Sequence, residues 1–374
     1  MQTRCHLSVL LNEQAKIYGD REAFIYKDFG GGEWKSVSWR DAAYEVKRVA
    51  NAMLEMGIRP GENIAIFSHN ALQFIYTDFG AWGVRAATIP FYATSSEDQV
   101  AFIVNDANIR FIFAGDQQQY NTARHLFSIC HGLEKVIVFN RNVRISTHDP
   151  VSIYFDDFLA MGDGFPRQEE VESLYAQACD DDIMSILYTS GTTGNSKGVV
   201  LTHGQARAAI EANSSALPLT PDDRILNFLP YAHIFEKGWS LLCISEGCRM
   251  IVLTDTKDVQ QAIRETNPTC MCSVPRFWEK VYAAIKARIE DSNHAMRKVF
   301  LHALDIGRKH NIEYLSKGLT PPMALSLEYK MVNSTIFSLI RKEMGLLNPH
   351  FFPTAGATVS PVVEEFIHSI GINM

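Results

Sequence analysis

The chain has 374 residues, of which 47% are hydrophobic and 21% are charged, and its formal net charge is −7. This composition is typical of a soluble globular protein, and the length predicts two or more domains or subdomains. The negative net charge and the lack of a basic stripe argue against nucleic acid as a main partner.

The seven cysteines are scattered along the chain, and none forms a C-x-x-C pair. Their spacing therefore indicates neither a disulfide framework nor a zinc site, and most lie in apolar runs typical of reduced core residues. The N-terminus shows no basic segment followed by an apolar stretch, so no signal peptide is indicated. The sequence contains no run of about 20 apolar residues, which is the length needed to span a bilayer. We expect a cytoplasmic protein, with reversible membrane contact left open.

In chain order, the first part of the sequence alternates between strand and helix patterns. The pattern predicts mostly parallel strands with helices on both faces of the sheet. Ser38 and Gly57 are placed to cap the two ends of one helix, which we expect to end at Met56. The expected helices cover 8–18, 39–56 and 70–82 and start again near 97 and 117, and the expected strands cover 22–27, 34–38, 63–67, 86–89, 111–114 and 136–139.

Residues 140–180 are less regular and are expected to lie on the surface. A short apolar run from Ile183 is expected to be a strand, and a helix is expected at 204–216 after the glycine-rich loop. A second alternation follows, with strands at 224–228, 249–253 and 269–273 and helices from 234 and at 258–266. We therefore predict two stacked α/β subdomains, one of residues 62–217 and one of 8–57 with 218–374. Residues 276–345 are helical in pattern and are split by Pro321-Pro322.

Residues 188–198 read YTSGTTGNSKG and separate two apolar strands. Small residues allow the backbone to approach a ligand closely, and their amides and hydroxyls suit a polyphosphate, to which Lys197 adds a charge. A flexible surface turn is the alternative. The common phosphate-loop pattern does not fit, because Gly191 and Gly194 are too close together, Ser196 replaces the second glycine and Gly198 follows the lysine.

This segment resembles the signature of the adenylate-forming enzymes, which include acyl-CoA synthetases, luciferases and the adenylation domains of peptide synthetases. Asp181-Asp182 before it and Leu201-Thr202-His203 after it continue the resemblance. The resemblance implies that the loop holds the β- and γ-phosphates of ATP and that Thr189 contacts Mg²⁺. The residues assigned to the phosphates are Ser190, Gly191, Thr192, Thr193, Gly194 and Lys197.

Residues 229–236 read LPYAHIFE and lie at a strand-to-helix turn, where α/β sheets place their ligands. Taken alone, a histidine here is more often a capping or core residue. The segment is similar to the LPxxHxFE segment of long-chain acyl-CoA synthetases, which implies that His233 lies beside the acyl carboxylate. Trp239 has two interpretations, a core residue, which we favour, or part of the wall of an acyl tunnel.

Two further segments extend the resemblance. Residues 273–282 and the helical region 276–345 resemble a segment and an insertion of the long-chain group, although the first alone would indicate only a helix start with an aromatic stripe. Residues 354–358 resemble the turn that lies against adenine, which implies contacts from Gly356, Ala357 and Thr358. Thr354 and Ala355 depart from the usual Ser-Gly-Gly-Ala, and this leaves the first two contacts open.

The resemblance implies an ATP-dependent long-chain fatty acid–CoA ligase that uses ATP, Mg²⁺ and coenzyme A. The family's aromatic-Gly-x-Thr-Glu motif, ribose-binding Asp and catalytic Lys do not occur before Met374. We therefore expect residues 1–374 to be the large N-terminal domain of a longer enzyme, incomplete at its C-terminal end, and to be inactive alone. An acyl-AMP ligase that delivers to a carrier protein, or a non-catalytic nucleotide- or lipid-binding relative, is the alternative. Oligomeric state is left open.

Overall fold

The computed structural model describes residues 6–189 and 196–374 of the chain. The chain divides into two compact units. Unit 1 comprises Met1–Asp222 and Pro230–Thr256, and unit 2 comprises Asp223–Leu229 and Lys257–Met374. This division by contacts differs from the predicted ranges 62–217 and 8–57 with 218–374, and those subdomain ranges stay a prediction.

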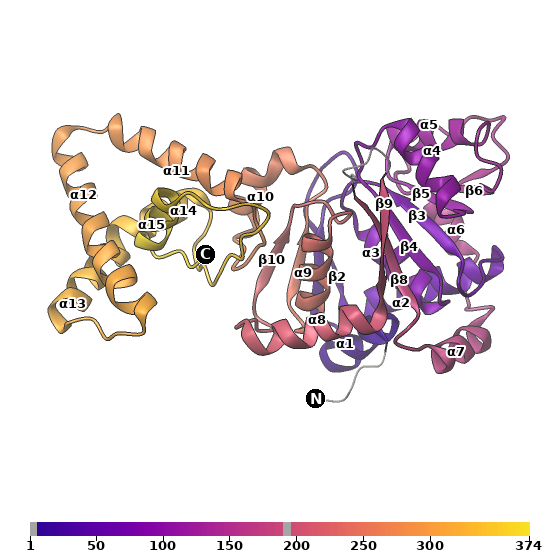
Figure 1. The fold of residues 1–374 in the computed structure, drawn as a ribbon, viewed down its shortest axis with the longest axis horizontal. Coiled ribbons are helices and arrows are strands. Elements are labelled where there is room, and N and C mark those ends of the chain that lie inside the picture. The colour runs from indigo at the N-terminus through magenta and orange to yellow at the C-terminus, as the bar shows by residue number, and fades with distance from the viewer. Residues whose placement is uncertain (1–5, 190–195) are drawn as a thin grey trace. The chain divides into compact units, whose positions relative to one another are not determined.

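Unit 1 contains a seven-stranded sheet with the strand order β7-β6-β5-β3-β4-β8-β9. Neighbouring strands pair in parallel, except that β9 runs antiparallel to β8. Strands β3, β4, β8 and β9 lie side by side in Figure 1. The bounds are β3 Asn63–Phe67, β4 Ala87–Phe91, β5 Phe111–Ala114, β6 Lys135–Val138, β7 Ser152–Tyr154, β8 Ile183–Thr189 and β9 Lys197–Thr202. The predicted, mostly parallel α/β architecture is confirmed.

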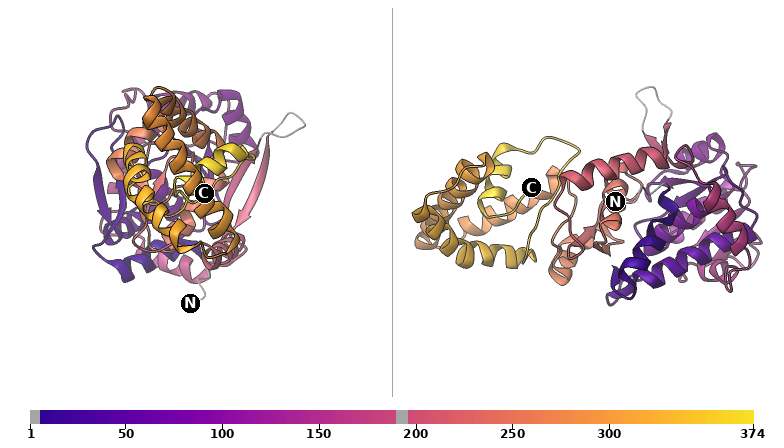
Figure 2. Two further views of the ribbon diagram at one scale, coloured as in Figure 1. Left: turned by 90° about the vertical axis from the view of Figure 1, so that its left-hand side faces the viewer. Right: turned by 90° about the horizontal axis from the view of Figure 1, so that it is seen from below.

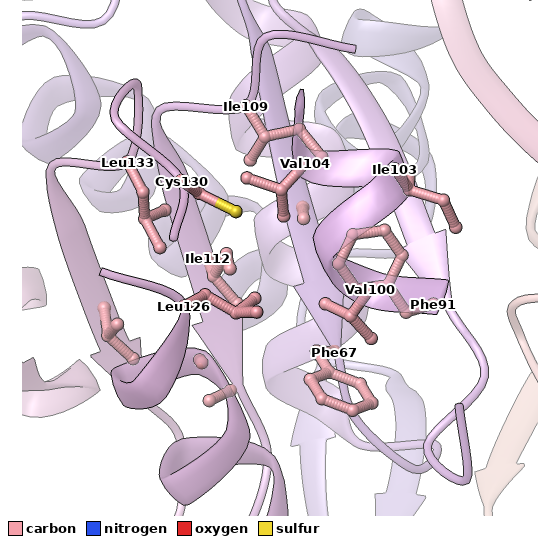
Figure 3. Close-up of a cluster of buried hydrophobic side chains, with 14 of the residues drawn as sticks. Phe67, Phe91, Val100, Ile103, Val104, Ile109, Ile112, Leu126, Cys130 and Leu133 are labelled. Carbon is pink, nitrogen blue, oxygen red and sulfur yellow. The ribbon is translucent and has the colours of Figure 1, made fainter. Parts of the chain in front are cut away.

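The central strands of this sheet are buried on both faces. Ile112 and Ala114 of β5 face a core shared with α4 (Glu97–Asp106) and α5 (Gln117–Leu126), which Figure 3 shows. On the opposite face, Phe113 of β5 packs edge-on against Phe158, with 5.4 Å between ring centroids. Strands buried on both faces read as continuous apolar runs, which is why the sequence pattern located them well.

The segment 140–180 is more ordered than its sequence pattern predicts. Strand β7 pairs in parallel with β6, and it is followed by α6 (Phe155–Ala160) and α7 (Gln168–Gln177). Phe155 and Phe158 are buried, so the prediction of an irregular surface segment is wrong for 152–160. A three-residue strand and a six-residue helix are too short to establish a recognisable period.

The remaining elements of unit 1 include a second group of strands, in which β11 (Arg249–Val252) pairs in parallel with β1 (Glu22–Tyr26). Strand β1 also pairs antiparallel with β2 (Lys35–Ser38). The hydroxyl of Ser38 accepts a hydrogen bond from the backbone N–H of Asp41 at 3.1 Å, which confirms the predicted N-cap of α2. The helices are α1 Leu10–Tyr18, α2 Trp39–Glu55, α3 Leu72–Gly83, α8 His203–Ala216 and α9 Ile234–Ser245.

Unit 2 combines three short extended segments with a group of helices. Cys270 forms isolated parallel bridges with Ile225 of β10 (Arg224–Asn227) and with Phe351, so the predicted strand 269–273 is present only as bridges. The orange and yellow helices of this unit lie together in Figure 2. Helix α12 contacts both α13 and α15. The helices are α10 Val259–Thr266, α11 Pro275–Glu290, α12 His294–Arg308, α13 Met323–Val332, α14 Ser338–Met344 and α15 Pro361–Ser369.

The predicted break in the helical region is also present. Pro322 is the N-cap residue of α13, so the proline pair interrupts the helices as expected. Pro361 occupies the first turn of α15 after Ser360, but the Ser360 side chain makes no capping hydrogen bond.

Candidate functional site

The β8–β9 hairpin carries the glycine-rich segment at the carboxyl end of a parallel strand. Strand β8 pairs in parallel with β4, and β9 returns antiparallel beside it. Thr189 lies directly opposite Lys197, and Tyr188 lies opposite Gly198. Carboxyl ends of parallel strands are the usual ligand edge of an α/β sheet. The candidate phosphate ligands Ser190, Gly191, Thr192, Thr193 and Gly194 lie outside the described residues.

A tyrosine and a glycine define the base of this hairpin. A Cβ added at Gly198 would lie 2.9 Å from Ile186 Cγ2 and 3.1 Å from Tyr188 Cζ, so the Tyr188 ring lies against the glycine backbone. The Tyr188 hydroxyl donates to the carboxylate of Asp106 at the end of α4. Burial raises the pKa of Tyr188, and the nearby Asp106 raises it further, so the phenol stays protonated. Gly198 is therefore required for packing as well as for any ligand approach.

Thr189 and Lys197 are both exposed at this base. Within the described part of the chain, the Lys197 ammonium has no ion-pair partner, so its charge is available to an anion. Thr189 offers one hydroxyl oxygen. Mg²⁺ is usually held by one or two protein oxygens together with substrate phosphates and water. One hydroxyl beside the glycine-rich segment would fit such a site as a single ligand.

The strand that leads into the hairpin is anchored by an ion pair. The guanidinium of Arg85 donates two hydrogen bonds to the Asp182 carboxylate, at 2.8 Å and 2.7 Å. Burial alone would raise the pKa of Asp182, but the hydrogen bonds from Arg85 and the Cys179 backbone N–H lower it to about 2. This bidentate geometry fixes the start of β8. Asp182, the second residue of the acidic pair before the strand, therefore has a structural partner that the sequence pattern did not show.

Two histidines stack beneath the other end of the hairpin. The ring of His203 lies 3.5 Å from that of His6, centroid to centroid, and edge-on to Trp82 at 5.5 Å. Burial lowers the pKa of His6 to about 4 and that of His203 to about 2, where the neighbouring His6 lowers it further. Both rings are therefore neutral at pH 7. His203 lies in the structural core and is not presented to a ligand.

His233 is the N-cap residue of α9 and is exposed. Its Nδ1 accepts a hydrogen bond from the backbone N–H of Phe235 at 3.2 Å. In the neutral ring the proton then lies on Nε2, and this N–H can donate to an anion. The capping interpretation is thus correct for Nδ1, and a carboxylate-binding role for Nε2 stays a prediction.

A buried ion pair holds the segment that carries His233. The Lys237 ammonium lies 2.9 Å and 2.8 Å from the two carboxylate oxygens of Asp78 on α3, and both side chains are almost fully buried. The ammonium also lies over the rings of Phe74 and Trp82, at 5.6 Å and 5.5 Å from their centroids. Burial raises the pKa of Asp78. The only sequence signal for this pair is a single acid inside the apolar helix α3.

Trp239 lies two residues further along α9 and is 5% exposed. This degree of burial supports its interpretation as a core residue.

In unit 2, the adenine-turn candidates are attached to residues 273–282. The indole N–H of Trp278 lies 2.8 Å from the Ser273 hydroxyl and 3.0 Å from the Thr354 hydroxyl. The backbone N–H of Ala355 donates to the Ser273 carbonyl at 3.1 Å. Thr354 therefore departs from the family pattern at a position where its hydroxyl joins this network. Sequence reasoning treated the two segments separately and missed the contact.

Beyond that anchor the turn is open to solvent. Gly356 has φ of +96°, which an L side chain rarely adopts, and Gly356, Ala357 and Thr358 are exposed. An exposed turn with a bare backbone can lie flat against a planar ring. Its contact with adenine stays a prediction.

The chain is similar to known proteins over nearly its whole length. The model of the family described as AMP-binding enzyme matches residues 11–373. The chain belongs to this family. A long-chain fatty acid–CoA ligase of Rattus norvegicus is 24% identical over 99% of this chain and 56% of its own length. A long-chain fatty acid–CoA ligase of Mycobacterium tuberculosis is 28% identical over 95% of this chain and 57% of its own length. The chain thus spans little more than half of these relatives.

Solved structures confirm the fold of this family member. A long-chain fatty acid–CoA ligase from Archaeoglobus fulgidus matches with a TM-score of 0.65 at 18% identity, over 98% of this chain and 61% of that chain. The N-terminal domain of a protein from Mycobacterium tuberculosis, named FACL13, matches with a TM-score of 0.62 at 18% identity, over 98% and 74% of the two chains. Among the described residues, no helix combines the length and apolarity needed to cross a bilayer.

Proposed function

We propose that the intact protein is an ATP-dependent long-chain fatty acid–CoA ligase. The observation that carries this proposal is the family match over 11–373 together with long-chain fatty acid–CoA ligases among its relatives. The hairpin supports it, because it presents Lys197 and Thr189 at the carboxyl edge of a parallel sheet. Residues 1–374 would form part of the large N-terminal domain, with 276–345 as a helical insertion, and a cytoplasmic location remains part of the proposal.

The proposed reaction has two steps. An oxygen of the fatty acid carboxylate forms a bond to the α-phosphorus of ATP, and the bond to the pyrophosphate group breaks. The thiol of coenzyme A then displaces AMP and forms the thioester. Because the first step brings an anion to a polyanion, neutralisation of charge and positioning must supply most of the rate increase. In this proposal Lys197 would neutralise pyrophosphate oxygens, and Thr189 would act as one Mg²⁺ ligand.

The other candidate residues complete the proposed site. The N–H groups and hydroxyls of Ser190, Gly191, Thr192, Thr193 and Gly194 would bind the β- and γ-phosphates. The Nε2–H of His233 would orient the acyl carboxylate, because its Nδ1 is engaged by the backbone. The exposed turn of Gly356, Ala357 and Thr358 would flank adenine.

The test is Lys197→Ala in the intact protein. A charge-assisted contact contributes about 1.5–3 kcal/mol, so the rate of pyrophosphate release should fall at least about tenfold. Lys16→Ala on α1 removes another exposed lysine and should leave the rate unchanged. Release of AMP should depend on coenzyme A in the wild-type protein. Equal rates for the two variants would show that the hairpin does not have its proposed role. AMP release that responds only to a carrier protein would show that the carrier protein, and not coenzyme A, accepts the acyl group.

A further inference from the structure

Three side chains with metal-binding atoms converge in unit 2, and none of them has been assigned a role above. Asp223, Cys270 and His350 each offer one ligand atom, and these atoms lie within 4.8 Å of one another. The His350 Nδ1 lies 3.1 Å and 3.2 Å from the two carboxylate oxygens of Asp223. The Cys270 Sγ lies 3.5 Å from Asp223 Oδ1. Carboxylate, thiolate and imidazole together form a donor set that suits Zn²⁺.

The fold explains how residues so far apart in sequence meet. Asp223 immediately precedes β10, and Cys270 forms parallel bridges with Ile225 of β10 and with Phe351, which follows His350. The backbone N–H of His350 donates to the Thr269 carbonyl at 2.8 Å. Because the three segments run in parallel, their amino ends lie at one edge, and the three side chains project from it. Separations of 47 and 80 residues leave no sequence signature of the kind that C-x-x-C provides.

The distances between the ligand atoms fit tetrahedral coordination of one ion. With Zn–O and Zn–N bonds of about 2.0–2.1 Å and a Zn–S bond of about 2.3 Å, tetrahedral geometry requires an O···N edge of about 3.3 Å and an S···O edge of about 3.5 Å. The observed edges are 3.1 Å and 3.5 Å. The Thr269 hydroxyl donates to Asp223 Oδ1 at 2.7 Å, which orients the carboxylate as outer partners of metal ligands do. The side chain of His350 is 36% exposed, so an ion and a fourth, water ligand have access.

We propose that Asp223, Cys270 and His350 bind one zinc-type divalent cation, which links three segments of unit 2. The inference does not depend on the proposed ligase function. Burial raises the pKa of the Cys270 thiol, with Asp223 adding to the shift, so the thiol is protonated without metal and must release its proton to solvent on binding. The competing explanation is a carboxylate that accepts hydrogen bonds from Thr269, Cys270 and His350 and binds no ion.

The test is metal titration of the purified, chelator-treated protein with Zn²⁺ and, separately, with Co²⁺. We expect one equivalent of Zn²⁺ per chain and, with Co²⁺, a thiolate-to-metal charge-transfer absorption band. Cys270→Ser should abolish the band and raise the Kd for Zn²⁺ at least about tenfold. Cys272→Ser is the matched control, because Cys272 is equally buried two residues along the same segment, and it should retain both properties.

A second variant covers the case in which Cys270→Ser does not fold. His350→Gln changes the most exposed of the three ligands and should weaken Zn²⁺ binding at least about tenfold while retaining the cobalt band at high Co²⁺ concentration. His368→Gln on α15 is the matched control and should leave both Zn²⁺ binding and the cobalt band unchanged. The proposal is overturned if the wild-type protein binds no stoichiometric Zn²⁺. It is equally overturned if Cys270→Ser keeps the band or if the control variants lose Zn²⁺ to the same extent.

Discussion

Replacing Lys237 by methionine should be among the most destabilising single changes on α9. The substitution keeps most of the side-chain volume and removes only the charge, which lies within 2.9 Å of both Asp78 oxygens. Asp78 would then be 3% exposed with its cation gone, so the carboxyl group must either stay charged without a partner or take up a proton, and both cost free energy. Loss of one partner from a buried ion pair costs about 3–5 kcal/mol. The free energy of unfolding, measured by urea titration with tryptophan fluorescence, should fall by this amount.

The chain offers a matched control for this prediction. Lys309 and Asp305 form an exposed Lys–Asp pair, with side chains 46% and 43% exposed. Because such pairs contribute about 0–1 kcal/mol, Lys309→Met should change the free energy of unfolding very little. The double variant Asp78→Leu with Lys237→Met should recover most of the loss, since a buried pair can be replaced by apolar side chains at little cost. Equal, small effects of Lys237→Met and Lys309→Met would refute the reasoning.

Three other predictions concern stability in acid, backbone packing and substrate length. His6 and His203 ionise near pH 6.5 when unfolded but have pKa values of about 4 and about 2 when folded, so the unfolded state binds more protons below pH 6.5. Stability should fall by about 2 kcal/mol per histidine between pH 6.5 and 5, and urea midpoints of His203→Phe should show a weaker pH dependence. A Cβ at Gly307 would lie 2.1 Å from the Ser369 carbonyl oxygen. Gly307→Ala should therefore lower the free energy of unfolding by about 1–3 kcal/mol, whereas Gly132→Ala, with nothing within 4 Å, should change it by no more than about 0.5 kcal/mol. In the intact protein, the affinity for the fatty acid should rise about fourfold per buried methylene, and equal turnover of acetate and a long-chain acid would contradict the assignment to the long-chain group.

Local patterns in the sequence located most of the elements. Strands such as β3 and β5 are short apolar runs that need no distant partner to be recognised, and their alternation with helices predicts a parallel sheet. The glycine-rich segment was recognised for the same reason, since its eleven residues are contiguous. The prediction failed at 152–160, where the elements are shorter than the period that would identify them.

Contacts between distant residues could be seen only in the folded chain. Lys237 lies 159 residues from Asp78, and nothing near either residue in sequence indicates the other. The Asp223, Cys270 and His350 group arises because three parallel segments begin at one edge, which depends on strand pairing rather than on spacing. Propensity and hydrophobic period act over a few residues, whereas burial of a charge, convergence of ligands and the pKa of a side chain depend on which segments the fold brings together.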